Sequence, residues 1–288
     1  MLTLPAAKQS LEYNKSLGDL LEVLKASAIF QFHIFQSMDK PSEDYRLNLD
    51  YCLEIIKRKG PHHPYLEEKK AMGSLIVVIT SDEGFMGELN MALINTALDI
   101  YKSQKDEILV LGRSGAKYME DLARPFVPMP ALSEDLNYSQ IEDFRDYLFD
   151  HYTKKSSRII FVYPKFISLN QQHIETVQLL PYQFPDLKTE IRVGALMEAA
   201  FIYPDERRAL ARLIELQAAF KILQIEQSSK LAEFAAKIMH LEESTGQLEL
   251  ITQKEAFEYF RLVHTLKDKS IREISASKIL LEKKARET

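Results

Sequence analysis

The feature that most limits how this chain can fold is a long segment near its C-terminus without helix-breaking residues. From Asp205 to about Lys284 there is no proline, and the only glycine is Gly246. A continuous helix over this stretch would extend on the order of 120 Å at about 1.5 Å per residue. Since an average globular helix has only about 11 to 12 residues, the segment predicts one exceptionally long helix that needs a partner.

Apolar residues recur along this helix in steps of three and four, which is the spacing of a coiled-coil seam. The repeat runs through Leu213, Leu216, Phe220 and Leu223 and, after a shift, through Leu231, Phe234, Ile238 and Leu241. The N-terminal segment has a similar repeat after Ser10, a candidate N-cap, at Leu17, Leu20, Leu24, Ile34 and Met38. We therefore expect the two terminal segments to pair, antiparallel if both leave the same central domain. The predicted helix-pair seam contains Leu20, Leu24, Phe220, Leu223, Phe234, Ile238 and Leu241.

The middle of the chain alternates between short apolar runs and helical segments. Strands are predicted at residues 75–79, 107–111, 158–162 and 173–180, and helices at 90–103, 117–122 and 139–154. This alternation is typical of a mostly parallel sheet. The predicted fold class is α/β, with a long antiparallel two-helix coiled coil from the N- and C-terminal segments and a central Rossmann-like α/β domain. The predicted boundaries are 1–60 for the N-terminal coiled-coil helix, 61–204 for the central domain and 205–288 for the C-terminal coiled-coil helix.

Charge and composition exclude several classes of function. The net charge of -5 gives no basic field for nucleic acid or an anionic membrane surface. No apolar run approaches the roughly 20 residues that a membrane span needs, and the first residues lack the pattern of a signal peptide. We therefore expect no direct membrane insertion and a cytoplasmic location. The single cysteine, Cys52, excludes an internal disulfide framework.

Candidate catalytic and metal-binding patterns are weak. The turn after the first strand, Ser81 to Asn90, lacks the Gly-Lys-Ser/Thr ending of a phosphate loop, and Glu83 and Glu88 would oppose a phosphate. The pair His62-His63 stands without a cysteine or carboxylate cluster at ligand spacing, which favours a polar turn over a metal site. We predict no catalytic residue, no cofactor and no metal ligand.

The same turn, Ser81-Asp-Glu-Gly-Phe-Met-Gly-Glu-Leu-Asn90, resembles the S-D-R-G-L-C-G-G-F-N signature of the ATP synthase gamma subunit. Four further segments are similar to the family's sequence in the same order, at residues 109–115, 162–168, 177–181 and 233–239. The signature residues, which the resemblance places at the base of the stalk, are Ser81, Asp82, Gly84, Gly87 and Asn90.

The resemblance implies a divergent central-stalk subunit of an F-type rotary ATP synthase, which is not itself catalytic. Its partners would be the catalytic ring of alpha- and beta-type subunits, an epsilon-type subunit and the membrane c-ring. The chain would turn inside the ring and couple proton or sodium flow to ATP synthesis or hydrolysis. It would lie in the cytoplasm, peripheral to the inner or plasma membrane. Matching positions assign ring contacts to Lys25, Lys267, Asp268 and Ser270.

Two departures from the family pattern keep alternatives open. Lys267-Asp268 stands where the family has an Arg-Gln pair, and Glu83 replaces the signature arginine. Lysine lacks the planar fork with which arginine binds carboxylates. The chain could therefore be the main gamma subunit, a gamma-like paralogue, or a coiled-coil scaffold or adaptor without a rotary role. A Rossmann-like enzyme is the least favoured alternative, because a phosphate-binding fingerprint is missing from the sequence.

Overall fold

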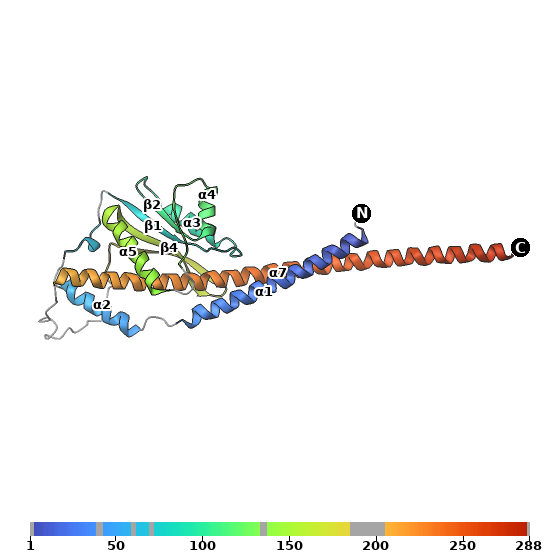
Figure 1. Cartoon of the computed structure of the whole chain (residues 1–288), viewed down its shortest axis with the longest axis horizontal. Coiled ribbons are helices and arrows are strands. Elements are labelled where there is room, and N and C mark those ends of the chain that lie inside the picture. The colour runs from blue at the N-terminus through green and yellow to red at the C-terminus, as the bar shows by residue number, and fades with distance from the viewer. Residues whose placement is uncertain are drawn as a thin grey trace. The chain divides into compact units, whose positions relative to one another are not determined.

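The computed structural model describes residues 3–38, 43–58, 62–68, 72–132, 137–184 and 205–286. The chain forms two compact units. The larger unit comprises residues 28–239, and the smaller unit combines residues 1–27 with residues 240–288. Two helices contribute to both units: α1, Leu4–Ser37, and α7, Glu206–Arg286. Figure 1 shows the order of the elements along the chain.

A five-stranded mixed sheet forms the centre of the larger unit. Its strands are β1 Gly73–Ile79, β2 Glu107–Leu111, β3 Val127–Met129, β4 Ser156–Ser168 and β5 Gln171–Leu180. The order is β3-β2-β1-β4-β5, in which the first four strands are parallel and β5 is antiparallel to β4. Every residue of β1 is buried, as expected for a parallel strand covered on both faces. The prediction missed β3, a three-residue strand that contains Pro128.

Helices cover both faces of this sheet (Figure 1). The first face packs against α3, Leu89–Ile100, and α4, Arg113–Asp121. The other face packs against α5, Tyr138–Lys154, against α2, Glu43–Arg58, and against the first part of α7. A short 3-10 helix, η1, spans Pro64–Leu66. The predicted α/β fold with paired terminal helices is confirmed by these elements and by the helix contacts described next.

In the larger unit, the end of α1 packs against the middle of α7. Phe35 stacks on Phe234 with ring centroids 5.6 Å apart. Around them, Ala28, Phe32 and Ala235 complete a buried apolar cluster, against which Ile238 packs. This cluster includes two residues of the predicted seam, Phe234 and Ile238. An aromatic pair of this kind contributes about 0.5–1.5 kcal/mol beyond the area that it buries.

The prediction is wrong about the partner of Phe220 and Leu223. Leu223 packs on the apolar core beneath the sheet, together with Leu210 and Ile214 of α7. Phe220 lines a pocket beside Asp50 of α2 and Tyr182. The physical reason is that the three-four spacing gives α7 an apolar face without specifying which surface covers it, and here the sheet and α5 cover it. The first turns of α7 are therefore part of the α/β core.

In the smaller unit, the buried face of α1 repeats every seven residues, at Ala7, Asn14 and Leu21. This is the repeat of a left-handed coiled coil. The assignment of Leu20 to the seam is wrong, because Leu20 is 53% exposed whereas its neighbour Leu21 is 8% exposed. At this turn the apolar face of α1 is centred on Leu21, one residue from the predicted position. Leu24 is half-buried and Leu241 is fully buried.

Polar contacts fix the direction of this helix pair. Ser10 Oγ donates to the Glu255 carboxylate at 3.0 Å, and Asn14 Nδ2 donates to it at 2.8 Å. Farther along α1, Lys25 Nζ lies 3.0 Å from Glu242 Oε2. Residue numbers rise along α1 as they fall along α7, so the two helices are antiparallel.

Candidate functional site

The signature loop, residues 81–88, begins where β1 ends and α3 follows. Strand β1 is central, and the sheet order reverses between β1 and β4, which is the kind of position where open α/β sheets bind ligands. Thr80 leads into the loop. Its Oγ1 donates to the carbonyl of Leu111 at 2.6 Å and accepts from the backbone N–H of Gly115 at 3.2 Å. These contacts fasten the start of the loop to β2 and α4.

Ser81 and Asn90 close the loop on itself. The Ser81 backbone N–H donates to Asn90 Oδ1 at 3.2 Å, and Asn90 Nδ2 donates to Ser81 Oγ at 2.9 Å. Ser81 Oγ in turn donates to the carbonyl of Glu83 at 2.7 Å. The two outermost signature residues thus hold the ends of the loop together.

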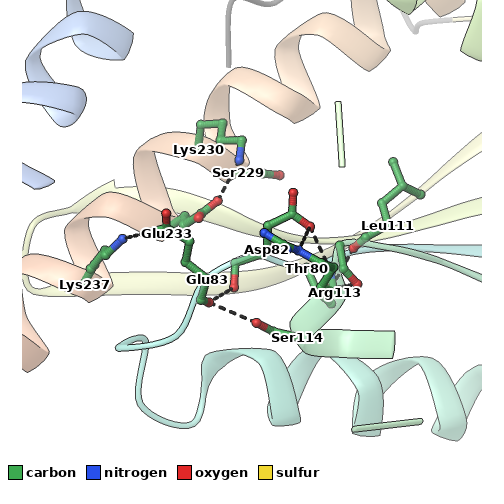
Figure 2. Close-up of polar contacts among 12 residues, drawn as sticks. Thr80, Asp82, Glu83, Leu111, Arg113, Ser114, Ser229, Lys230, Glu233 and Lys237 are labelled. Atoms are coloured by element: carbon green, nitrogen blue, oxygen red, sulfur yellow. Dashed lines mark hydrogen bonds and ion pairs between the residues drawn. The ribbon is translucent and has the colours of Figure 1, made fainter. Parts of the chain in front are cut away.

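Asp82 and Glu83 tie the loop to α4, as Figure 2 shows. The backbone N–H of Arg113 donates to Asp82 Oδ1 at 2.9 Å, which supplies a carboxylate at the start of α4. Ser114 Oγ donates to the carbonyl of Glu83 at 3.0 Å. Asp82 therefore acts as a cap for a helix that has no side-chain cap of its own at Gly112.

The tip of the loop carries the two signature glycines. Gly87 has φ of +55°, a left-handed conformation that glycine adopts without strain. A Cβ on Gly84 would meet no atom within 4 Å, so packing does not demand glycine there. Between them, Phe85 is also left-handed, with φ of 65°, and is 47% exposed. Its neighbour Met86 is buried.

A charged ladder on α7 faces the signature loop. Its members are Glu226, Lys230, Glu233 and Lys237, which are spaced by four, three and four residues and so share one helical face. Lys237 forms an ion pair with Glu83, and Lys230 Nζ lies 3.0 Å from Glu233 Oε2 (Figure 2). The spacing of these four residues is visible in the sequence, but only the fold shows that the face they share covers the signature loop.

The crevice at the sheet switch point is filled by these α7 side chains. A cavity of only ≈10 Å³ remains between β1, the loop, α3, β4 and α7. That volume is about what one water molecule needs, whereas small-molecule sites have about 300–1,000 Å³. Across the described ranges, the acidic, histidine and cysteine side chains form no group of three that could hold a metal ion. The contacts at this crevice are therefore suited to joining the signature loop to α7.

A Ser-His-Glu relay lies at the opposite end of the strands. His151 Nε2 is 2.8 Å from Glu107 Oε2, and His151 Nδ1 is 3.3 Å from Ser156 Oγ. No sequence pattern pointed to this group, because Glu107 lies 44 residues from His151 and is brought to it only by the fold. Ser156 is only 2% exposed, so a substrate could not reach its hydroxyl. The relay joins α5 to the edge where β2 and β4 begin.

The predicted turn at His62-His63 is explained by hydrogen bonding. The backbone N–H of Tyr65 donates to His63 Nδ1 at 3.2 Å, so His63 caps η1. Burial lowers the pKa of His63, which favours the neutral ring that can accept this bond.

The predicted ring-contact residues lie in the smaller unit. Lys25 bridges Glu22, at 2.8 Å, and Glu242, at 3.0 Å. These hydrogen bonds, first that to Glu22, raise the pKa of Lys25. Lys267, Asp268 and Ser270 are exposed on α7, and within the described residues their side chains form no hydrogen bond or ion pair. Lys25 therefore differs from the other three residues: its side chain is engaged within the helix pair, whereas theirs point to solvent.

No helix within the described part of the chain has both the length and the apolar character required for a membrane crossing.

Comparison with known proteins gives a consistent family. The model of the ATP synthase family matches residues 6–274. Curated relatives include the ATP synthase gamma chain of Mycoplasmopsis pulmonis, 24% identical over 68% of this chain and 70% of the relative. The gamma chain of Clostridium beijerinckii is 25% identical over 69% of each, and that of Pelotomaculum thermopropionicum is 22% identical over 80% of this chain and 82% of the relative.

Solved structures share the fold. A chain in the OSCP/F1/c-ring structure of the Euglena gracilis mitochondrial ATP synthase superposes with a TM-score of 0.70 at 17% identity, covering 96% of this chain and 94% of that one. A chain of the Tetrahymena thermophila central stalk and c-ring gives a TM-score of 0.54 at 13% identity, over 81% of this chain and 99% of that one. Because the family model covers far more than half of the sequence, the chain belongs to the ATP synthase gamma family.

Proposed function

We propose that this chain is the central-stalk subunit of an F-type ATP synthase and carries torque without catalysing a reaction itself. The observation that carries the proposal is the antiparallel pairing of α1 with α7, in a chain of the gamma family. A rotor shaft must resist bending and twisting. Two paired helices with a fixed register supply that stiffness better than one helix alone.

The register of the helix pair is fixed by partly buried polar contacts as well as by apolar ones. The Glu255 carboxylate accepts hydrogen bonds from both Ser10 and Asn14. A one-turn slip between the helices would break both hydrogen bonds, each of which contributes about 0.5–1.5 kcal/mol. Polar groups at core positions of coiled coils select register in this way.

Exposed apolar side chains on α7 give the shaft a surface for partners. Phe257 is 70% exposed, Phe260 58%, Ile271 60% and Ile274 68%. Large apolar side chains left in solvent at this density are typical of interaction surfaces. We assign this surface to the catalytic ring, together with Lys25, Lys267, Asp268 and Ser270. As the shaft turns, each catalytic subunit would meet a different face, which favours a different conformation of that subunit.

The α/β domain would form the base of the stalk and contact an epsilon-type subunit and the membrane c-ring. The non-catalytic role is supported by the filled crevice at the switch point, where α7 side chains leave only ≈10 Å³. The subunit would be cytoplasmic and attached to the inner or plasma membrane through its complex.

Reconstitution tests the proposal directly. The full chain would be combined with the catalytic subunits of its own cell, and ATP hydrolysis and rotation of a probe on the chain would be measured. We expect a stoichiometric complex and directional rotation. A complex that does not rotate would assign the chain to a scaffold, and failure to copurify with a hexameric ATPase head from native membranes would overturn the proposal.

A pair of matched variants isolates the role of the helix pair. Glu255→Lys removes the carboxylate that accepts hydrogen bonds from Ser10 and Asn14. Glu258→Lys makes the same change of charge at an exposed position nearby. We expect Glu255→Lys to reduce rotation-coupled hydrolysis several-fold and Glu258→Lys to change it little. Equal effects of the two variants would show that the register contact has no part in torque transmission.

A further inference from the structure

Glu226 is the most deeply buried acid in the described part of the larger unit. The residue lies in α7 and is 1% exposed. Its Oε2 atom is buried and has no hydrogen-bond partner among the described residues. A buried carboxylate oxygen without a partner is costly, above all when it carries a charge. The position therefore requires either a proton on the carboxyl group or a further ligand.

The cavity beside Glu226 has the size of a single water molecule. Its volume is ≈10 Å³, and its uncharged polar lining comes from Thr80, Ser81, Asn90 and Ser229, while Glu226, Lys230 and Glu233 of α7 supply the charged groups. A buried water usually makes about three hydrogen bonds. The hydroxyl and amide groups of this lining can supply them, and Glu226 Oε2 can supply one more.

Lys230 is the basic residue that lines the cavity with Glu226, and its charge favours the ionised carboxylate. Lys230 is nearby, but its ammonium group is paired with Glu233 at 3.0 Å, in side chains that are 7% and 11% exposed. One lysine is thus shared between two buried acids. Burial raises the pKa of Glu226 to about 7; Lys230 opposes this rise, and the charge of Glu233 adds to it.

The other elements around the cavity contribute no charge to it. Among its described lining residues, β1, α3 and β4 supply Ile79, Leu93 and Pro164 together with the polar groups named above. The next charged pair is Lys237 with Glu83, which joins α7 to the signature loop. Among the residues that line the cavity, the charges that act on Glu226 therefore come from its own helix, from Lys230 and Glu233, and their effects are smaller than that of burial.

We propose that Glu226 and this cavity form a proton-binding site, which holds a neutral carboxyl group and one water molecule, and that loss of the proton loosens the signature loop from α7. The proton leaves to bulk solvent. The carboxylate that remains is buried between the loop and a second acid, Glu233. Solvation of this charge requires separation of the loop from α7, the elements that enclose the cavity. The inference concerns the isolated subunit and does not depend on its place in a rotor.

The sign of the pH effect follows from the location of the proton. The folded chain holds this proton to a higher pH than the unfolded chain does. The raised pKa of Glu226 therefore adds to the free energy of unfolding. This stabilisation is fully present below about pH 4.5, the ordinary pKa of the group, and is lost as pH rises from about 4.5 to about 7. Above that range the loss is complete and constant.

The variant Glu226→Gln tests the site, because glutamine has the shape of a neutral glutamic acid. Urea unfolding of the full chain would be measured from pH 4.5 to 8, with Glu249→Gln, an exposed glutamate of the same helix, as control. We expect Glu226→Gln to gain stability relative to wild type as pH rises, by on the order of 100-fold in the unfolding equilibrium constant across this window. A parallel pH dependence in wild type and Glu226→Gln would overturn the proposal.

Two measurements extend the test. The ¹³C signal of the Glu226 carboxyl group in wild type, assigned by its disappearance in Glu226→Gln, should show a neutral group at pH 5.5, and an ionised group there would refute the assignment without relying on the variant's stability. At pH 8, hydrogen exchange at residues 81–88 should be several-fold faster in wild type than in Glu226→Gln. Equal exchange would refute the proposed loosening of the loop.

Discussion

Lys237 of α7 forms an ion pair with Glu83 of the signature loop. Glu83 occupies the position where the gamma signature has an arginine. The lysine side chain is 9% exposed and the glutamate side chain is 65% exposed. The acidic residue at position 83 is therefore matched by a base inside the same chain. This pairing connects a loop at the sheet edge to a helix that begins more than one hundred residues later.

A double-mutant cycle should detect this connection. Glu83→Gln, Lys237→Met and the double variant would be compared by urea unfolding. Because Glu83 is exposed, we expect a coupling free energy of only about 0.5–1 kcal/mol. The coupling should shrink in 1 M salt. Zero coupling at low salt would mean that the two charges do not stabilise the loop.

Phe234→Ala should be strongly destabilising, because it removes the ring that stacks on Phe35 in a buried cluster. We expect a loss of about 3 kcal/mol in the free energy of unfolding. Phe257→Ala serves as the control, since Phe257 is 70% exposed on the same helix. The assignment of the seam would be untenable if the two variants were equally stable.

Gly115→Ala should destabilise the junction between β1 and α4. A Cβ at Gly115 would lie 2.3 Å from Thr80 Oγ1, which is far inside contact distance. We expect a cost of about 1–3 kcal/mol in thermal or urea unfolding. Gly246→Ala is the matched control, because a Cβ there meets nothing within 4 Å and alanine favours a helix by up to about 1 kcal/mol. A stabilising Gly115→Ala would contradict the described packing.

Tyr152 should contribute a component of stability that is lost in alkali. Its hydroxyl donates to the carbonyl of Glu67 at 2.7 Å, and burial raises its pKa to about 12 from an ordinary value of 10. Because the folded chain retains the proton, this stability is present below pH 10 and declines between about pH 10 and 12. We expect Tyr152→Phe to be less stable by about 1 kcal/mol at pH 7. The difference from wild type should narrow in alkali, and a constant difference up to pH 12 would be inconsistent with this account.

Local sequence patterns predicted much of the α/β domain because its strands and helices are short and strongly patterned. Strand β2 was expected at residues 107–111 and is Glu107–Leu111. The predicted helix at 139–154 is α5, Tyr138–Lys154, which begins after an Asn137 cap that accepts from Ser139 N–H. Strand β3 escaped prediction, because three residues with a central proline carry no periodicity and form a strand only beside β2.

A long helix near the C-terminus could be predicted from composition, since no proline and only Gly246 occur between Asp205 and Lys284. The sequence also predicted that this helix has apolar residues to bury. The partner of each part of the helix became known only from the fold: the sheet for Leu223, α1 for Phe234, and the signature loop for Glu226 and Lys237. The physical reason is that helical periodicity specifies a face and its polarity, whereas the surface that covers this face is set by long-range contacts that no local spacing encodes.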